Sequence, residues 1–343
     1  MKKHVNIPIF IPHLGCPNQC VFCNQRSITG HKDFDPESVV WLIEEALSTI
    51  PNDTEKEIAF FGGSFTGIDY ALMCRLLDIA YSYVKTGRVA SIRCSTRPDY
   101  INEKILDKLK ASGVSVIELG LQSIDENVLK TCKRGHTFIQ EKTAVKMIKE
   151  RGFSLVGQMM IGLPGSTLEK EKETAEFICE SGADGARIYP TAVFKDTELC
   201  HMAECGEYTP LDLEDAIFRT AEVLKIFNDH KVKVIRVGLC ASENLSSPDS
   251  YFAGPNHSAL GELCENRFFY SLIHEKLAEL SLKNDGRAVV KVPKGAISKA
   301  IGQKKNNKLR LISEFSLAEL SFVEEERLTG YEVECEERKN KCT

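Results

Sequence analysis

The sequence predicts an α/β fold built on a parallel sheet, which is either doubly wound or a partial barrel. Six strand-like runs recur within the first 190 residues, and amphipathic, helix-like stretches separate them. Polar or glycine-rich segments follow these runs, as expected where the carboxyl ends of parallel strands build an active site. With 343 residues, 43% of them hydrophobic, the chain is long enough for one large catalytic domain and a small appendage.

The strands and the helices between them can be assigned in chain order. The predicted strands span residues 5–11, 57–62, 90–96, 114–120, 154–162 and 185–190. A helix over 37–50 follows Asp35 as a candidate N-cap and has Pro36 at its first position. Helices over 103–113 and 137–152 each end at a glycine stop signal. We expect parallel strands because a helix connects each strand to the next.

Beyond the sixth strand the pattern changes. A helix-like stretch over 213–230 precedes a strand-like run over 232–239. We expect three regions, namely a partial barrel over residues 1–230, an extension over 231–284 that completes the core, and a small basic domain with a charged tail over 285–343.

Composition and charge exclude several classes of protein. No run of about 18 apolar residues occurs, and the short apolar start lacks a signal-peptide cleavage site. We therefore expect a cytoplasmic protein that does not contact a membrane. The net charge of −5 argues against a surface that binds nucleic acid all over, but it is compatible with a local basic patch.

Three cysteines lie close together near the N-terminus. Cys16, Cys20 and Cys23 follow the spacing C-x3-C-x2-C, and His13 precedes them. This spacing is compatible with a disulfide scaffold, a redox pair, a zinc site completed by His13, or an iron–sulfur cluster with one open ligand position. A cytosolic chain of this size does not need a disulfide framework. Zinc is the main alternative to the cluster, which is favoured because the cysteines directly follow a strand at the expected catalytic face.

Four later cysteines could in principle form a second cluster or a zinc site. Their spacing matches no compact metal-binding pattern, so we expect ordinary thiols at Cys200, Cys205, Cys240 and Cys264.

Several segments together resemble a known family. The cysteine spacing, with Phe22 before the last cysteine, resembles the signature of radical S-adenosylmethionine (SAM) enzymes. FFGGSFTG at 60–67 is similar to the glycine-rich SAM motif of that superfamily. Three more segments are similar to the radical SAM domain of the Elongator catalytic subunit and its shorter bacterial relatives, which lack the acetyltransferase domain: 95–100, 118–137 and 162–167. The resemblance covers roughly residues 5–270.

The resemblance implies a fold, two cofactors and a set of binding residues. The fold would be a partial (β/α)6 radical SAM barrel. The three cysteines would hold a [4Fe–4S] cluster whose open iron binds SAM, and the reduced cluster would cleave SAM to a 5′-deoxyadenosyl radical. Five residues are expected to bind SAM: Gly62, Gly63, Arg97, Gln122 and Ser123.

Each of these residue types suits a contact with SAM. The two glycines would let bare backbone approach the cofactor, and Arg97 offers a forked cation for a carboxylate. Gln122 and Ser123 follow the fourth strand and could bind the ribose or the carboxylate, although Ser123 is also a candidate helix cap. His136 is a candidate for the substrate side of the site, and His257 has no assigned role.

The basic segment 287–315 has a pattern of its own. Strand, helix, turn, helix and strand follow one another, which resembles a minimal KH module whose G-x-x-G loop contacts nucleotide backbone. The turn here is Gly302-Gln303-Lys304-Lys305 and lacks the second glycine. We expect RNA contacts at Gly302, Lys304 and Lys305, with a solvated basic face on a small packing domain as the alternative.

Three functions are compatible with these features. The first is a radical SAM enzyme that modifies RNA, specifically a tRNA base. The second is a radical SAM enzyme acting on a small molecule or a protein. The third is a non-catalytic RNA-binding protein stabilised by zinc. For the first, we expect tRNA or another RNA and an electron-donor protein as partners, and no DNA. The Elongator catalytic subunit also carries an acetyltransferase domain. We expect that this sequence of 343 residues does not contain such a domain, and so we expect no acetyl transfer within this chain.

Overall fold

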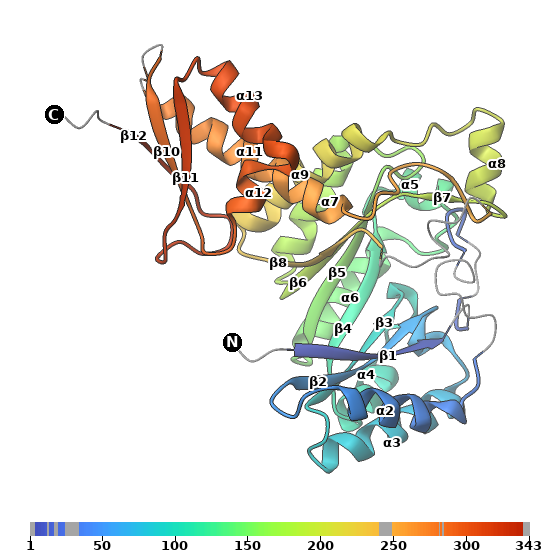
Figure 1. Cartoon of the computed structure of the whole chain (residues 1–343). Helices are drawn as coiled ribbons and strands as arrows, with labels where there is room; N and C mark the ends of the chain where they lie inside the picture. The colour runs from blue at the N-terminus through green and yellow to red at the C-terminus, as the bar shows by residue number, and fades with distance from the viewer. Residues whose placement is uncertain are drawn as a thin grey trace. The chain divides into compact units, whose positions relative to one another are not determined.

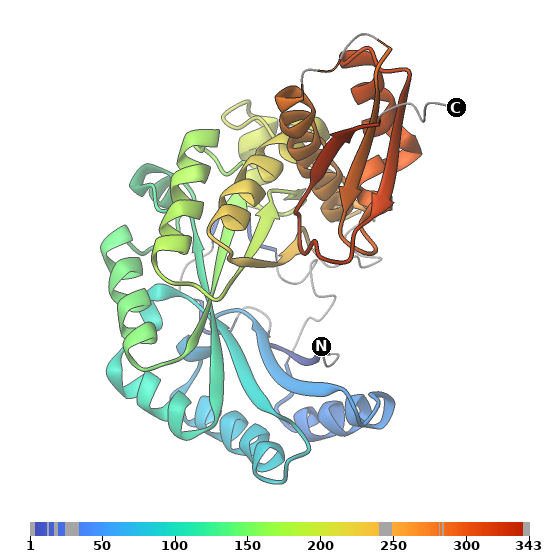
Figure 2. The same ribbon diagram turned by 90° about the vertical axis from the view of Figure 1, so that its left-hand side faces the viewer.

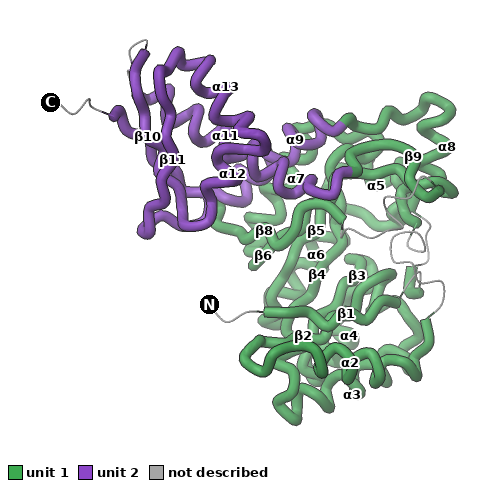
Figure 3. Tube along the Cα trace, viewed as in Figure 1, with its two compact units in different colours: residues 1–212, 230–256 green, residues 213–229, 257–343 purple. Residues whose placement is uncertain are grey.

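The chain forms two compact units in the computed structural model shown in Figure 1. The structure describes residues 4–11, 14–16, 20–24, 34–239, 249–280, 282 and 285–338. Unit 1 comprises residues 1–212 and 230–256, and unit 2 comprises residues 213–229 and 257–343 (Figure 3). The three-region division expected from the sequence placed its boundaries differently, after residues 230 and 284.

Unit 1 is built on a seven-stranded sheet in the order β1-β2-β3-β4-β5-β6-β8, and every neighbouring pair of strands is parallel. The strands are β1 (His4–Ile11), β2 (Glu55–Gly62), β3 (Ser91–Thr96), β4 (Val114–Gln122), β5 (Ser154–Ile161), β6 (Gly185–Pro190) and β8 (Lys233–Val237). The sheet is curled, and the helices of unit 1 cover its outer side (Figure 2). The expected partial barrel is present, but the expected count of six strands is wrong because β8 pairs with β6.

The helices of unit 1 lie between successive strands, as parallel pairing requires. They are α2 (Ser38–Thr49), α3 (Tyr70–Lys85), α4 (Glu103–Ala111), α5 (Glu126–Thr131), α6 (Phe138–Glu150), α7 (Leu168–Glu180) and α8 (Glu198–Glu204), with short 3-10 turns η1 (Phe65–Gly67) and η2 (Pro98–Tyr100). A two-stranded antiparallel ribbon joins β7 (Val193–Phe194) to β9 (Tyr251–Ala253).

One predicted helix start is wrong. Glu37 occupies the N-cap position of α2 without a side-chain bond to the helix. Asp35 Oδ1 instead accepts a hydrogen bond from the Glu37 amide at 3.0 Å, in the turn before the helix. By contrast, Thr137 and Gln140 form a capping box at the start of α6.

Strands β2, β4 and β6 are buried along most of their length, which is typical of parallel sheets, whereas β1 alternates and β8 is largely exposed. Four buried charged residues interrupt the apolar core and link strands β2, β3, β4 and β6: Glu57, Arg93, Glu118 and Arg187. Their charges balance, two acidic against two basic. Such a network contributes little net stability but is costly to break, because removing one partner leaves an unpaired buried charge.

Unit 2 consists of helices packed with a three-stranded sheet in the order β11-β10-β12. Its elements are α9 (Leu213–Asp229), α11 (Leu260–Glu279), β10 (Arg287–Val292), α12 (Ile297–Ile301), η3 (Gln303–Lys305), α13 (Asn306–Glu314), β11 (Glu319–Glu324) and β12 (Glu334–Glu337). The expected strand–helix–turn–helix–strand order is observed, with β10 and β11 parallel. Within the segment taken as a charged tail, β12 pairs antiparallel with β10.

Among the described residues, no helix combines the length and the apolar character needed to cross a membrane.

Candidate active site

The predicted site residues of unit 1 gather at the carboxyl ends of four adjacent strands. The described part of the cysteine loop, 14–16 and 20–24, follows β1, and the GGSFTG segment begins at the end of β2. Arg97 directly follows β3, and Gln122 ends β4. Because β1 to β4 are neighbours in the sheet, these segments lie side by side.

Backbone contacts join the cysteine loop to the glycine-rich segment. The Gly63 amide donates to Ile11 O at 2.9 Å, and the Ser64 amide donates to Leu14 O at 3.1 Å. A Cβ on Gly63 would lie 2.1 Å from Leu14 O, and a Cβ on Gly62 would lie 2.6 Å from Ile11 O. The glycines are therefore required by close packing of the chain against itself, and their contact with SAM stays a prediction.

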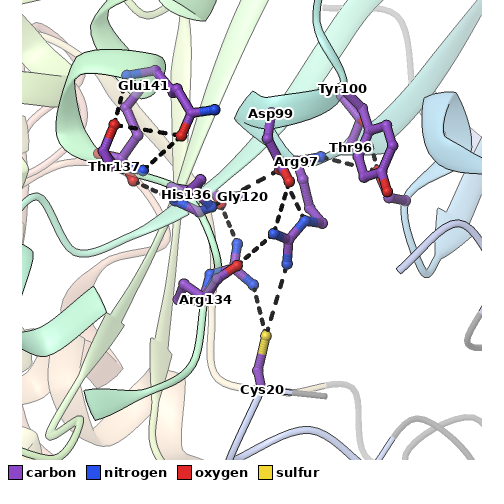
Figure 4. Close-up of polar contacts among 12 residues, drawn as sticks. Cys20, Thr96, Arg97, Asp99, Tyr100, Gly120, Arg134, His136, Thr137 and Glu141 are labelled. Carbon is purple, nitrogen blue, oxygen red and sulfur yellow. Dashed lines mark hydrogen bonds and ion pairs between the residues drawn. The ribbon is translucent and has the colours of Figure 1, made fainter. Parts of the chain in front are cut away.

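Two arginines donate to the sulfur of one cysteine (Figure 4). Cys20 Sγ lies 3.3 Å from Arg134 Nη1 and 3.9 Å from Arg97 Nη1. All three side chains are buried. Both donors are cations, and a cysteine sulfur that faces cations is suited to binding a metal.

Arg97 is held in place by a carboxylate. Its Nε and Nη2 bind Asp99 at 2.9 and 3.0 Å, and Nη2 also donates to Arg134 O. The Arg97 amide donates to Ser64 Oγ at 3.2 Å, which ties β3 to the glycine-rich segment. Most of the Arg97 donors are thus occupied within the protein, and its predicted contact with a SAM carboxylate stays a prediction.

Arg134 has no such carboxylate. Its Nη2 donates to Gly120 O at 2.6 Å, its Nε is buried without a partner, and it forms no ion pair with a carboxylate in the described part of the chain. Arg134 lies in the segment 118–137, and the resemblance of that segment to the family is its signal in the sequence. Its burial beside Cys20 depends on contacts between residues 114 positions apart, which no local pattern indicates.

Gln122 has an unusual backbone for its position. Its φ is +75°, a left-handed conformation that costs a non-glycine residue about 1–3 kcal/mol, and the β4–β5 register shifts beside it. Its Oε1 is buried without a partner among the described residues. Ser123 is also buried, and its Oγ accepts from the Asp125 amide at 3.2 Å. Asp125, not Ser123, caps α5.

A buried histidine and glutamate lie behind the arginines. His136 Nε2 and Glu141 Oε1 are 2.8 Å apart, and His136 Nδ1 lies 4.0 Å from Asp99 Oδ1. Burial, with Arg134 and Arg97 nearby, lowers the pKa of His136 to about 3. Burial raises the pKa of Glu141 to about 9. The pair is therefore uncharged overall at neutral pH, and His136 is a buried structural partner of Glu141.

The remaining part of the cysteine loop is anchored to the same region. The Val21 amide donates to Cys132 O at 3.2 Å, and Val21 O accepts from the Leu199 amide at 2.8 Å. Burial raises the pKa of Cys16, although Arg97 and Arg134 oppose the effect. His13, the candidate zinc ligand, lies outside the described residues.

A zinc site is not preformed in the described parts of the chain, where no three His, Cys, Asp or Glu side chains converge on one point. A cubane cluster has its irons at separate corners, so its ligands need not converge in this way. The orphaned Gln122 oxygen and the buried Arg134, which pairs with no carboxylate in the described part of the chain, suit a negatively charged cluster with a small polar cofactor beside it.

The later cysteines are spread over different environments. Cys200 and Cys264 are buried, with the pKa of Cys264 raised to about 12 by burial, whereas Cys205 is exposed. Cys240 lies outside the described residues. His257 is exposed and accepts a hydrogen bond from the Ala259 amide just before α11.

The predicted RNA contacts of unit 2 form a tight turn between α12 and α13. Gly302 has a φ of +78°, and a Cβ there would lie 2.9 Å from Asn307 Cγ. Lys304 and Lys305 follow with φ of +51° and +63°, and both are exposed. Two consecutive left-handed lysines are unusual, because only glycine adopts this conformation without cost.

Comparison with known families identifies the architecture. The radical SAM superfamily model matches residues 10–178, and the radical SAM C-terminal domain model matches residues 183–269. The chain belongs to the radical SAM superfamily. The matched region contains the three cysteines and the arginines that contact Cys20.

Relatives of this radical SAM chain include proteins named for tRNA modification. A tRNA uridine(34) acetyltransferase of Methanocaldococcus jannaschii is 31% identical, with 59% of this chain and 45% of that protein covered. Human Elongator complex protein 3 is 27% identical, with 63% of this chain and 47% of that protein covered. Escherichia coli protein YhcC is 26% identical, with 61% and 71% covered. The chain spans about half the length of the first two relatives.

A solved structure has a similar fold. The archaeal Methanocaldococcus infernus Elp3 with an N-terminal deletion matches with a TM-score of 0.63 and 25% identity, covering 78% of this chain and 63% of that one. The curled sheet of unit 1 is accordingly the half-barrel of the radical SAM fold.

Proposed function

We propose that this protein is a radical SAM enzyme that reductively cleaves SAM and modifies a tRNA base. Cys16, Cys20 and Cys23 would hold a [4Fe–4S] cluster. With the cluster bound, one electron from a donor protein would break the S–C5′ bond of SAM and give methionine and a 5′-deoxyadenosyl radical.

The single observation that carries this proposal is the buried Arg134 beside Cys20. A buried cation without a partner costs several kcal/mol, and Arg134 has no carboxylate among the described residues. As a ligand of the cluster, the Cys20 sulfur would supply the missing negative charge at 3.3 Å from Arg134 Nη1. A buried cysteine that faces a buried arginine is therefore suited to a metal site.

Other residues of the site would bind and orient SAM. The free Oε1 of Gln122 offers an acceptor for a hydroxyl or an amino group, and its strained backbone indicates a functional constraint. Ser123 lies next to it and is buried. Gly62 and Gly63 let the cysteine loop pack closely against the end of β2, and their own contact with SAM remains part of the proposal.

A tRNA substrate is supported by the relatives' names and by unit 2. The order β10-α12-turn-α13-β11 supports a KH-like module, and Lys304 and Lys305 at the turn would contact phosphate. This turn has one glycine fewer than the G-x-x-G loop of a KH module. It would therefore contact RNA through lysine side chains more than through close approach of its backbone.

Anaerobic purification tests the cofactor. We expect brown protein with about four irons per chain, which cleaves SAM when reduced. Cys20→Ala should lose the cluster and the cleavage, whereas Cys205→Ala, at an exposed cysteine, should keep both. Colourless protein with stoichiometric zinc, or SAM cleavage retained by Cys20→Ala, would contradict the proposal.

The substrate is tested separately. Reduced protein is incubated with SAM and total tRNA, and the nucleosides are analysed by mass spectrometry. We expect a new modified nucleoside that requires both SAM and the intact cysteines. SAM cleavage without any change in tRNA would favour a small-molecule or protein substrate.

A further inference from the structure

The two arginines beside Cys20 differ in their counter-ions. Asp99 binds Arg97 through two hydrogen bonds and so offsets its charge. Among the described residues, the Arg134 guanidinium donates to Cys20 Sγ and to the Gly120 carbonyl at 2.6 Å, and neither partner is a carboxylate. Arg134 is therefore the uncompensated positive charge next to the cysteine sulfur.

The position of Arg134 is fixed by several contacts. Its carbonyl accepts from Arg97, its amide donates to Leu129 O at 3.0 Å, and its Nη2 is anchored on β4. These contacts leave Nη1 directed at Cys20 Sγ at 3.3 Å. The side chain is buried, so water does not screen its charge from the sulfur.

We propose that Arg134 sets the reduction potential of the cluster by donating a hydrogen bond and a positive charge to the Cys20 sulfur. This inference rests on the proposed function. Reduction adds one negative charge to a cluster, and a nearby cation stabilises the reduced form more than the oxidised form. Hydrogen bonds to sulfur and net charge both shift the potentials of iron–sulfur clusters. Arg134 thus raises the potential and makes the cluster easier to reduce.

Arg97 makes a smaller contribution at the same sulfur. Its Nη1 is more distant, at 3.9 Å, and Asp99 cancels much of its charge. Its main role is to support Arg134, whose backbone carbonyl it binds. The order of effects on the potential should therefore be Arg134 before Arg97.

Redox titration of the reconstituted protein, followed by electron paramagnetic resonance, tests the inference. Arg134→Gln should shift the midpoint potential to a more negative value than in the wild type. Arg134→Lys should give a smaller shift in the same direction, because lysine keeps the charge but cannot reach Cys20 and Gly120 O with a planar fork. Arg151→Gln, at a partly exposed arginine paired with Asp107, serves as the control and should leave the potential unchanged.

The outcomes separate this inference from the proposed function. Wild-type protein that binds no iron would overturn both claims. Wild-type protein that cleaves SAM, with full iron and an unchanged potential in Arg134→Gln, would overturn the role of Arg134 alone. If Arg134→Gln binds no cluster, the test rests on Arg134→Lys. A midpoint potential of Arg134→Lys equal to that of the wild type would then overturn the inference.

Discussion

His136 and Glu141 form a buried pair whose proton balance changes on folding. The folded-state pKa of Glu141, about 9, is above its ordinary value, so the stability this residue contributes is full below pH 4.5 and is lost as pH rises towards 9. The folded-state pKa of His136, about 3, is below its ordinary value, so its contribution is lost as pH falls from 6.5 towards 3. The pair therefore stabilises the protein most between about pH 4.5 and 6.5.

Glu141→Gln tests this balance. Glutamine stays neutral and can still donate to His136 Nε2. The free energy of unfolding of the variant should therefore fall by less than that of the wild type when the pH rises from 6.5 to 9. The two decreases should differ by more than about 1.4 kcal/mol, which corresponds to one pKa unit. Chemical denaturation at each pH measures it, with Glu150→Gln on the exposed face of α6 as the control. Parallel pH profiles for wild type and Glu141→Gln would show that Glu141 is ionised when folded.

At the scale of elements, the site depends on the cysteine loop after β1 and on the glycine-rich segment after β2, which follow neighbouring strands. Gly15 has a φ of +75°, and a Cβ there would lie 2.1 Å from Ser64 O in the glycine-rich segment. Gly165 has nearly the same φ, +76°, but a Cβ added there would meet no atom within 4 Å. The two glycines therefore share the backbone requirement and differ in the space around them.

Alanine at each glycine separates these two effects. Gly165→Ala should cost about 1–2 kcal/mol, which is the cost of a left-handed non-glycine residue. Gly15→Ala should cost more and should also lower the iron content, because the cysteine loop must move away from Ser64. Denaturation and iron analysis of both variants measure this. If the two variants had equal stability and equal iron content, the cysteine loop could move away from the glycine-rich segment without loss of the site.

At the scale of the whole molecule, the net charge of −5 means that RNA binding must depend on a local basic surface. Lys304→Ala with Lys305→Ala should weaken tRNA binding and reduce the slope of log affinity against log salt by about 1 to 2. The control pair, Lys142→Ala with Lys146→Ala, lies on the exposed side of α6 in unit 1. Binding measured from low to moderate salt checks this, and an unchanged slope in the Lys304 and Lys305 variant would remove the KH-like proposal.

Local signals in the sequence were enough for most of the elements. Each of the six predicted strands agrees with an observed strand to within about two residues, because apolar runs and glycine stops report local structure. The helix start at Asp35 failed because an Asp side chain can bond the backbone of a turn as well as that of a helix. The cysteine spacing and the glycine-rich segment likewise indicated the site without knowledge of the fold.

The sequence by itself determined the order of strands and helices, the cysteine loop and its place after the first strand, since these depend on residues close together in the chain. Only the tertiary structure decided that β8 completes the sheet, that β12 pairs with β10, and that Arg134 faces Cys20. These features depend on contacts between distant residues. A pairing partner for a strand edge or a buried charge is chosen by packing in three dimensions, and periodicity along the chain carries no information about it.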